Sequence, residues 1–218
     1  MIFSKSITFD ADEIGPAVAS VHVPYAQISE ESLFIEKLRS GDETAFETLV
    51  DRYTRDIFAL LFRLTGNAED AGDLTQETFI RVLRSVRHFR GESGIRTWLF
   101  RIAINESRNR FRWWKRRKRE LTISLDGLAG GSSGRAVWET LRDDSTSPED
   151  AALSREREQA LRAALGSISE SYREAVVLCD IEGLSYEETA LATGVGIGTV
   201  KSRISRGREE LRIRLKGF

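Results

Sequence analysis

Apolar residues recur every three or four positions over long stretches of this chain, and that spacing limits its fold more than any other feature. At 100° per residue, such spacing lines one face of an α-helix with apolar side chains. No stretch shows the apolar–polar alternation of a half-buried strand. We therefore expect an all-α fold of two small helical domains joined by a flexible linker. In one such stretch the apolar positions are Phe46, Leu49, Val50, Tyr53, Ile57, Phe58, Leu61 and Leu64.

Residues that cap helices stand at the ends of the periodic stretches. Asp42 is placed to cap the helix that precedes Gly66, and Asn67 is placed to cap the helix that follows. A further helix starts at about Ile95 and continues into the basic stretch 113–119. These signals predict a helical bundle in the N-terminal half.

Breaks in the periodicity divide the chain into four parts. Residues 1–28 show no sustained pattern, and we expect a flexible N-terminal arm there. Residues 121–147 are rich in glycine and serine and read as a flexible linker. The helical domains are then 29–120 and 148–218, and Pro148 is suited to the first turn of a helix.

Composition excludes several classes of protein and site. The single cysteine, Cys179, stands among apolar residues and is expected in the core, and the histidines, His22 and His88, lie far apart. A disulfide within the chain is excluded and a metal centre is disfavoured. The longest apolar run, 57–62, is too short to span a bilayer, and no secretory signal precedes it, so we expect a cytoplasmic protein without membrane insertion. No nucleophile–base pair stands out, and we expect neither an enzyme nor a cofactor.

Positive charge is concentrated in two islands of an otherwise acidic chain. The formal net charge is −1, yet residues 81–120 hold 14 Lys and Arg against 3 Asp and Glu. Residues 191–218 hold 7 against 2. Such segments favour a polyanion partner, because cations beside phosphates release condensed counterions. A solvated basic helix face is the alternative, but then nothing would counterbalance the mutual repulsion of these positive charges.

The C-terminal island follows a pattern typical of a helix-turn-helix. Ser185 and Glu188 form a capping box, and Gly194 suits the positive φ of a tight turn. A second helix, starting near Gly198, carries an apolar stripe on one face. Its other face suits the DNA major groove, although an ordinary helical hairpin with a solvated basic face is the alternative. The stripe comprises Val200, Ile204, Gly207, Leu211 and Leu215, and the outward residues are Thr199, Lys201, Ser202, Ser205 and Arg206.

The other island interleaves cations with aromatic side chains. Aromatic faces stack on unpaired bases while cations hold the backbone, which suits single-stranded or melting DNA. Trp98 lies on the apolar stripe and is expected in the core, whereas at most one of two adjacent tryptophans can point fully inward. The interleaved residues are Arg108, Arg110, Arg112, Trp113, Trp114 and Lys115.

Four segments of the chain carry a family resemblance. Residues 180–188 (DIEGLSYEE) and 198–203 (GTVKSR) resemble region 4 of bacterial RNA polymerase sigma factors. Residues 73–79 (DLTQETF) and 96–105 (RTWLFRIAIN) resemble region 2 of the same family. With two such blocks in order and a linker between them, the chain resembles the small extracytoplasmic-function (ECF) group.

The resemblance implies which residues contact DNA and polymerase. In region 4 the minus-thirty-five element would be bound by Thr199, Lys201, Ser202, Arg203, Ser205 and Arg206. In region 2 the non-template strand of the minus-ten element, with one base flipped into a pocket, would be bound by Asn105, Arg108, Asn109, Arg112, Trp113 and Lys115. Core polymerase would be bound by Asp73, Gln76 and Glu77.

The resemblance also implies partners and a function. The partners are core RNA polymerase, through the clamp coiled coil of its largest subunit and the flap, promoter DNA, and an anti-sigma factor that holds the protein inactive. Free of partners, the protein is expected to be monomeric. It would direct core polymerase to promoters, melt the minus-ten element and start transcription. A stand-alone helix-turn-helix regulator is the alternative, but it leaves the region 2 segments without a purpose.

Overall fold

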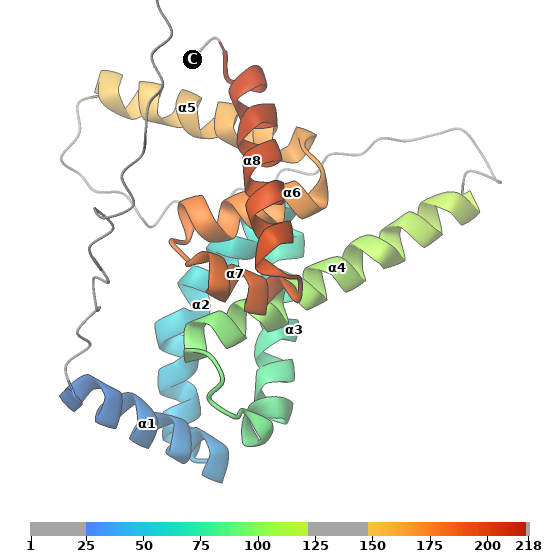
Figure 1. Cartoon of the computed structure of the whole chain (residues 1–218). Helices are drawn as coiled ribbons and strands as arrows, with labels where there is room; N and C mark the ends of the chain where they lie inside the picture. Colours follow the sequence, from blue (N-terminus) through green and yellow to red (C-terminus); the bar gives the residue numbers. More distant parts are fainter. Residues whose placement is uncertain (1–24, 122–147, 217–218) are drawn as a thin grey trace, which may run out of the picture.

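The computed structural model describes residues 25–121 and 148–216, and every regular element in those two ranges is a helix (Figure 1). The expected all-α fold is confirmed. The predicted linker lies outside the described residues apart from Leu121, and so does the predicted arm up to residue 24. The helices of the first range are α1 (Tyr25–Ser40), α2 (Glu43–Thr65), α3 (Ala68–Ser85), the short 3₁₀ turn η1 (Val86–His88) and α4 (Ile95–Leu121).

The predicted caps set the boundaries of α2 and α3. Asp42 accepts a hydrogen bond from the Ala45 amide at 2.8 Å, which satisfies a free N–H in the first turn of α2. Gly66 ends α2 with φ of 72°, a conformation that favours glycine. Asn67 accepts hydrogen bonds from the Glu69 and Asp70 amides in the first turn of α3. Helix α1 begins at Tyr25, a few residues earlier than the periodicity predicted.

The first unit is a bundle whose buried residues match the predicted stripe on α2. Leu49, Ile57 and Leu61 of the stripe are fully buried there and pack against α3 and α4, and so is Leu60, which the stripe did not include. Burial of apolar side chains of this size stabilises a fold by roughly 1.5–3 kcal/mol each. Leu83 of α3 is apolar but lies exposed on the surface.

The second unit contains the predicted helix-turn-helix. Ser185 accepts a hydrogen bond from the Glu188 amide and the Glu188 carboxylate accepts one from the Ser185 amide, so the capping box is confirmed. Gly194 follows with φ of 71°. The helices are α5 (Pro148–Ser167), α6 (Glu170–Val176), the π-helical turn η2 (Val177–Ile181), α7 (Tyr186–Thr193) and α8 (Ile197–Arg214).

Glycine 207 lets α8 lie against α6. A Cβ at Gly207 would stand 2.7 Å from Cγ2 of Val176 and 3.3 Å from the Tyr172 carbonyl oxygen, closer than side chains tolerate. Val200 and Ile204, from the predicted stripe, are buried in the same contact. Gly207 therefore fixes the separation of these two helices, and with it the direction in which α8 presents its outer face.

The two units share one continuous cluster of buried apolar residues. It runs from the α2–α4 bundle into the second unit, where it includes Leu165, Ile168 and Leu178. Arg173 of α6 donates to the carbonyls of Leu64 and Ile168, so it satisfies a free carbonyl at the end of α2. Among the described helices none is long and apolar enough to cross a membrane.

Candidate nucleic-acid and polymerase interfaces

The outer face of α8 is open to solvent. Its exposed residues stand opposite the buried stripe, as the periodicity predicted, and Arg203 lies at the side of the helix and is half-buried. Lys201 sits 5.9 Å from the centre of the Tyr186 ring, and Arg206 reaches the Tyr172 hydroxyl at 3.5 Å. These contacts are long, so both cations are free to move toward a phosphate or a base edge. The exposed residues of the predicted set are Thr199, Lys201, Ser202, Ser205 and Arg206.

Helix α4 carries a second polar face. Asn105 and Asn109, four residues apart, share that face and are both exposed, and the Arg112 guanidinium donates to Oδ1 of Asn109. An amide both donates and accepts, so such a pair can read a base edge. Lys115 extends the exposed face toward the end of the helix.

The adjacent tryptophans of α4 both face solvent. Trp113 is 42% and Trp114 44% exposed, and their rings meet edge-on with centres 5.3 Å apart. Arg117 lies 5.0 Å from the Trp113 ring centre. Two exposed indoles beside a cation form a platform on which unpaired bases can stack. Trp98 packs against Phe89 and the main apolar cluster but is only half-buried, so its predicted place in the core is met in part.

Arg108 is the exception among the predicted DNA contacts. Its guanidinium binds both carboxylate oxygens of Glu174, at 2.7 and 2.6 Å, and donates to the Thr193 carbonyl at 3.0 Å. Glu174 is only 3% exposed. The hydrogen bond to Glu174 raises the pKa of Arg108 above its ordinary value. In this arrangement Arg108 is occupied by the second unit.

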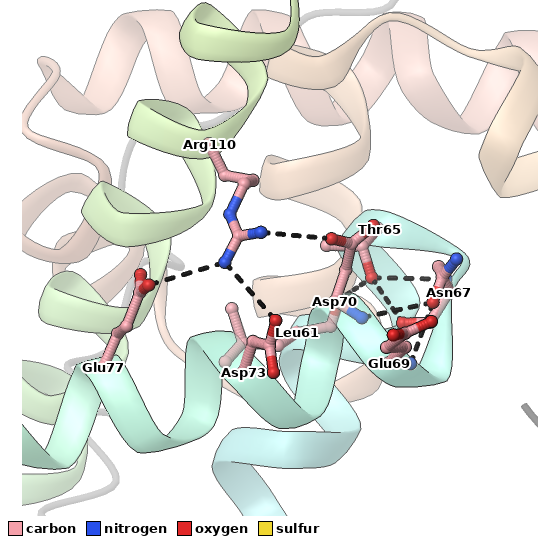
Figure 2. Close-up of polar contacts among 8 residues, drawn as sticks. All are labelled: Leu61, Thr65, Asn67, Glu69, Asp70, Asp73, Glu77 and Arg110. Atoms are coloured by element: carbon pink, nitrogen blue, oxygen red, sulfur yellow. Dashed lines mark hydrogen bonds and ion pairs between the residues drawn. The ribbon is translucent and has the colours of Figure 1, made fainter.

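The predicted polymerase-binding residues lie on the exposed face of α3. Asp73, Gln76 and Glu77 are all exposed. Figure 2 shows Arg110 of α4 reaching over to this face, where it pairs with three carboxylates. The distances are 3.5 Å to Asp70, 3.8 Å to Asp73 and 3.4 Å to Glu77. Arg110 thus joins the acidic face of α3 to the helix with the aromatic platform.

Comparison with known proteins decides the family. The family model described as Sigma-70 region 2 matches residues 49–119, and the model of Sigma-70, region 4, matches residues 158–211. The chain is 38% identical over 183 residues to the ECF RNA polymerase sigma-E factor of Haemophilus influenzae, covering 84% of this chain and 93% of that protein. The chain belongs to the ECF RNA polymerase sigma factors.

Two further relatives agree. The ECF sigma factor SigW of Bacillus subtilis is 35% identical over 182 residues, which cover 84% of this chain and 95% of SigW. The solved structure of the sigma factor RpoE of Bartonella quintana, in complex with the anti-sigma factor NepR, matches with a TM-score of 0.57 and 28% identity. That match covers 79% of this chain and 97% of RpoE. As a sigma factor, this chain is an initiation factor that directs RNA polymerase to promoter DNA, so the stand-alone regulator is not favoured.

The structure of the sigma factor also contains two hollows that the sequence did not reveal. A groove of about 660 Å³ lies between the units and is lined by Arg112, Trp114 and Lys115 of α4 together with Glu170 of α6. A smaller pocket of about 220 Å³ lies at the start of α4. Burial raises the pKa of Glu170, with the nearby Glu174 adding to the shift. Hollows require residues from distant segments, and periodicity along one helix carries no signal for them.

The smaller pocket has the chemistry of a base-binding site. It is lined by Trp98 and Phe89 of the first unit together with the cations Arg90 and Arg101 and the acid Glu92, which lies 3.8 Å from Arg90. Leu191 of α7 completes the lining from the second unit. An aromatic wall with nearby cations suits a flipped base and its phosphate.

Cys179 is half-buried and packs against the helix-turn-helix core formed by Ala175, Val200 and Ile204. Burial raises the pKa of this thiol, with Asp180 adding to the shift. A raised pKa keeps the thiol protonated and unreactive near neutral pH. The expectation of a core cysteine is therefore met in part, because the side chain keeps some exposure.

Proposed function

We propose that this sigma factor reads a promoter with two separate helix faces, one in each unit. The observation that carries the proposal is that the predicted residues of α4 and α8, apart from the half-buried Arg108 and Arg203, lie on solvent-exposed polar faces, with the apolar stripes buried behind them. In α8, Lys201 and Arg206 are placed to reach the minus-thirty-five element in the major groove. Thr199, Ser202 and Ser205 share that face, and Arg203 at its edge suits a phosphate.

The minus-ten element is assigned to α4. Asn105 and Asn109 contact base edges of the non-template strand, and Trp113 offers a stacking surface. Arg112 and Lys115 neutralise phosphates. Arg108 can contact DNA only after its ion pair with Glu174 breaks. The pocket between Phe89 and Trp98 is placed to receive a base that leaves the stack, which couples strand opening to sequence reading.

Core polymerase is assigned to the acidic face of α3. Asp73 and Glu77 present carboxylates to cations of the clamp coiled coil, with Gln76 between them. Region 4 contacts the flap. The domain boundaries proposed for these roles are 29–120 for region 2 and 148–218 for region 4.

The remaining properties follow from this role. The Bartonella quintana sigma factor RpoE, a relative of known structure, was solved in complex with an anti-sigma factor, which supports an anti-sigma partner for this chain as well. The factor itself performs no chemistry and needs no cofactor, because it borrows the catalytic core of polymerase. It works in the cytoplasm, where bacterial polymerase and chromosome meet, and is monomeric when free.

The test is run-off transcription with purified protein, bacterial core polymerase and a promoter library from the source genome. Discrete transcript starts that share two spaced upstream elements are expected. Asn105→Ala should lose selectivity at the minus-ten element alone, and Arg206→Ala at the minus-thirty-five element alone. Arg212→Ala is the matched control, since Arg212 is exposed on the same helix as Arg206 but pairs with Glu209. Absence of starts, despite specific duplex binding, would contradict the proposal.

A further inference from the structure

Arg110 of α4 stands between the two surfaces that the proposed function assigns to region 2. Its guanidinium lies 3.5 Å from Asp70, 3.8 Å from Asp73 and 3.4 Å from Glu77, all on α3 (Figure 2). Asp73 and Glu77 belong to the face assigned to core polymerase. Arg110 itself belongs to the helix assigned to the minus-ten strand, and it lines the same groove as Trp114. One side chain therefore borders on both binding partners.

Arg110 also lies in line with the exposed tryptophans of α4. Trp113 and Trp114 follow it by three and four residues and Arg117 by seven, spacings that place side chains on one side of a helix. Arg117 lies 5.0 Å from the Trp113 ring centre. A base stacked on these indoles has a phosphate on each side of it along the strand. Cations one turn before and one turn after the indoles match that arrangement.

The acids of α3 hold Arg110 by ion pairs that exchange easily. None of the three distances is shorter than 3.4 Å, and the side chains of Asp73 and Glu77 are 58% and 52% exposed. Long, exposed pairs of this kind contribute little to stability. A cation of a partner that arrives at Asp73 and Glu77 competes for the same carboxylate oxygens and repels the like charge of Arg110. Occupation of this face by such a partner therefore favours release of the guanidinium.

We propose that Arg110 is a further phosphate-binding residue of the minus-ten surface, and that core polymerase releases it by taking over Asp73 and Glu77. The released guanidinium then turns to the strand that stacks on the tryptophans. The inference rests on the two binding roles proposed for region 2. Because coupling between two binding sites is reciprocal, polymerase and the strand each strengthen the binding of the other.

The salt dependence of strand binding tests the new contact. The full chain, free or in holoenzyme, is titrated with the labelled non-template single strand of a promoter found by run-off transcription, and fluorescence anisotropy is followed. In holoenzyme, Arg110→Gln should weaken binding about three- to ten-fold at low salt. It should also lower the slope of log K against log salt concentration by about 0.7 in magnitude, the value for one phosphate contact on a single strand. The free protein should show neither change, because the acids occupy Arg110 there.

Two further variants show whether charge at this position is responsible. Arg110→Lys should keep the salt slope in holoenzyme, because lysine still neutralises a phosphate. Arg55→Gln is the matched control, since Arg55 is exposed on α2 in the same unit and forms no ion pair within the described residues. It removes the same charge and should leave the salt slope unchanged.

The affinity for core polymerase should move in the opposite direction. In Arg110→Gln the acids of α3 lose an internal competitor for polymerase cations. Binding to core should therefore tighten about two- to five-fold, in line with the strength of exposed ion pairs. Competition of each variant against the labelled natural chain for a limiting amount of core measures this. A residue that only stabilised the fold would lower both affinities together, so opposite signs identify competition.

Removal of an acid should release Arg110 without polymerase. The free Glu77→Gln protein should bind the strand about two- to five-fold more tightly, and the gain should vanish when Arg110→Gln is added. Glu69→Gln is the matched control, because Glu69 is exposed on the same helix and has no ion-pair partner among the residues that the structure describes. It removes the same charge, and its smaller effect should persist when Arg110→Gln is added.

The outcomes separate this inference from the proposed function. An unchanged salt slope in holoenzyme, or an equal loss in the free protein, would overturn the Arg110 contact, and weaker core binding by Arg110→Gln would overturn the competition. If that variant does not melt cooperatively, the comparison of Glu77→Gln with Glu69→Gln decides, because both leave Arg110 in place. If the natural chain gives no starts with core polymerase, the proposed function itself fails. If it gives starts and Arg110→Gln behaves as Arg55→Gln does, the inference alone fails.

Discussion

Helices α4 and α8 are both basic and both assigned to promoter DNA, but the fold holds them in different ways. α8 rests on α6 through Gly207 and leaves its outer face open. α4 is engaged on two sides, by Arg110 with the acids of α3 and by Arg108 with Glu174. The outer face of α8 is thus open to DNA, whereas α4 is partly covered by the second unit, which contains α8.

The difference shows that a row of basic residues does not by itself define an accessible surface. Arg108 and Arg110 stand two residues apart on one helix, yet their partners lie in different units. Arg108 meets a buried acid at bidentate distance, and Arg110 meets half-buried or exposed acids at 3.4–3.8 Å. Removing one partner of a buried, bidentate ion pair destabilises the fold strongly, whereas long, exposed ion pairs contribute little to stability.

The largest effect is expected where α8 touches α6. Gly207→Val places a branched side chain where even a Cβ would stand 2.7 Å from Val176, so α8 must move. We expect a loss of about 3 kcal/mol in the free energy of unfolding and a fall of roughly 10 °C in Tm. Circular dichroism melts measure this. Gly198→Ala is the matched control, because nothing lies within 4 Å of that position, and it should not destabilise the protein.

The next effect separates the open helix from the covered one. Arg206→Ala should weaken holoenzyme binding to a minus-thirty-five duplex about ten-fold, since a good base contact contributes roughly 1–3 kcal/mol. Tm should stay unchanged, because Arg206 is exposed. Electrophoretic mobility shifts over a salt series measure the affinity. An equal loss at every sequence tested would instead make Arg206 a phosphate contact.

A smaller effect is expected for Glu182, one of the acids that region 4 presents to region 2. Glu182 pairs with Arg63 at 2.7 Å and Arg96 at 2.9 Å, yet burial still raises its pKa above the ordinary value. A carboxyl whose pKa is higher in the folded state than in the unfolded state stabilises the folded chain. This contribution is fully present at pH values below the unfolded-state pKa of about 4.3. That contribution is lost as the pH rises through the raised value.

Near pH 7 the free energy of unfolding of Glu182→Gln should therefore equal that of the natural chain or exceed it by up to about 1 kcal/mol. The difference should shrink toward pH 4, where the natural carboxyl is itself neutral. Thermal melts of both proteins across this range check the sign. A Gln variant that is clearly less stable near pH 7 would show that the ion pairs with Arg63 and Arg96 outweigh the cost of burying Glu182.

The smallest effect is expected for Arg110. Arg110→Gln removes three long pairs with acids that are themselves partly or well exposed, so the free energy of unfolding should change by about 0.5 kcal/mol or less. Arg108→Gln should cost several times more, because it leaves Glu174 buried without its cation. Chemical denaturation of the two variants side by side gives the ratio. Equal costs would mean that the Arg108 pair is no stronger than a surface pair.

Local features of the fold were predictable because their causes are local. Asp42, Asn67 and Ser185 cap helices through amides two or three residues away, and the four-residue spacing of α8 decides which side chains it buries. The outward residues of α8 and the exposed Asn105 and Asn109 follow from the same rule. The sequence placed Gly207 on the buried stripe of α8. Its close approach to Val176 was not predictable, because Val176 lies on another helix.

The sequence by itself determined the helices, their caps, the two basic faces and the family. Only the tertiary structure decided that region 4 closes over region 2, because the ions concerned lie 66 residues apart in Arg108 and Glu174 and 86 apart in Arg96 and Glu182. In the sequence each of these looks like an ordinary solvated charge. Their importance comes from burial, which removes water as a hydrogen-bonding partner, so that each buried charge needs an opposite charge beside it. Burial is a property of packed units and not of any single helix.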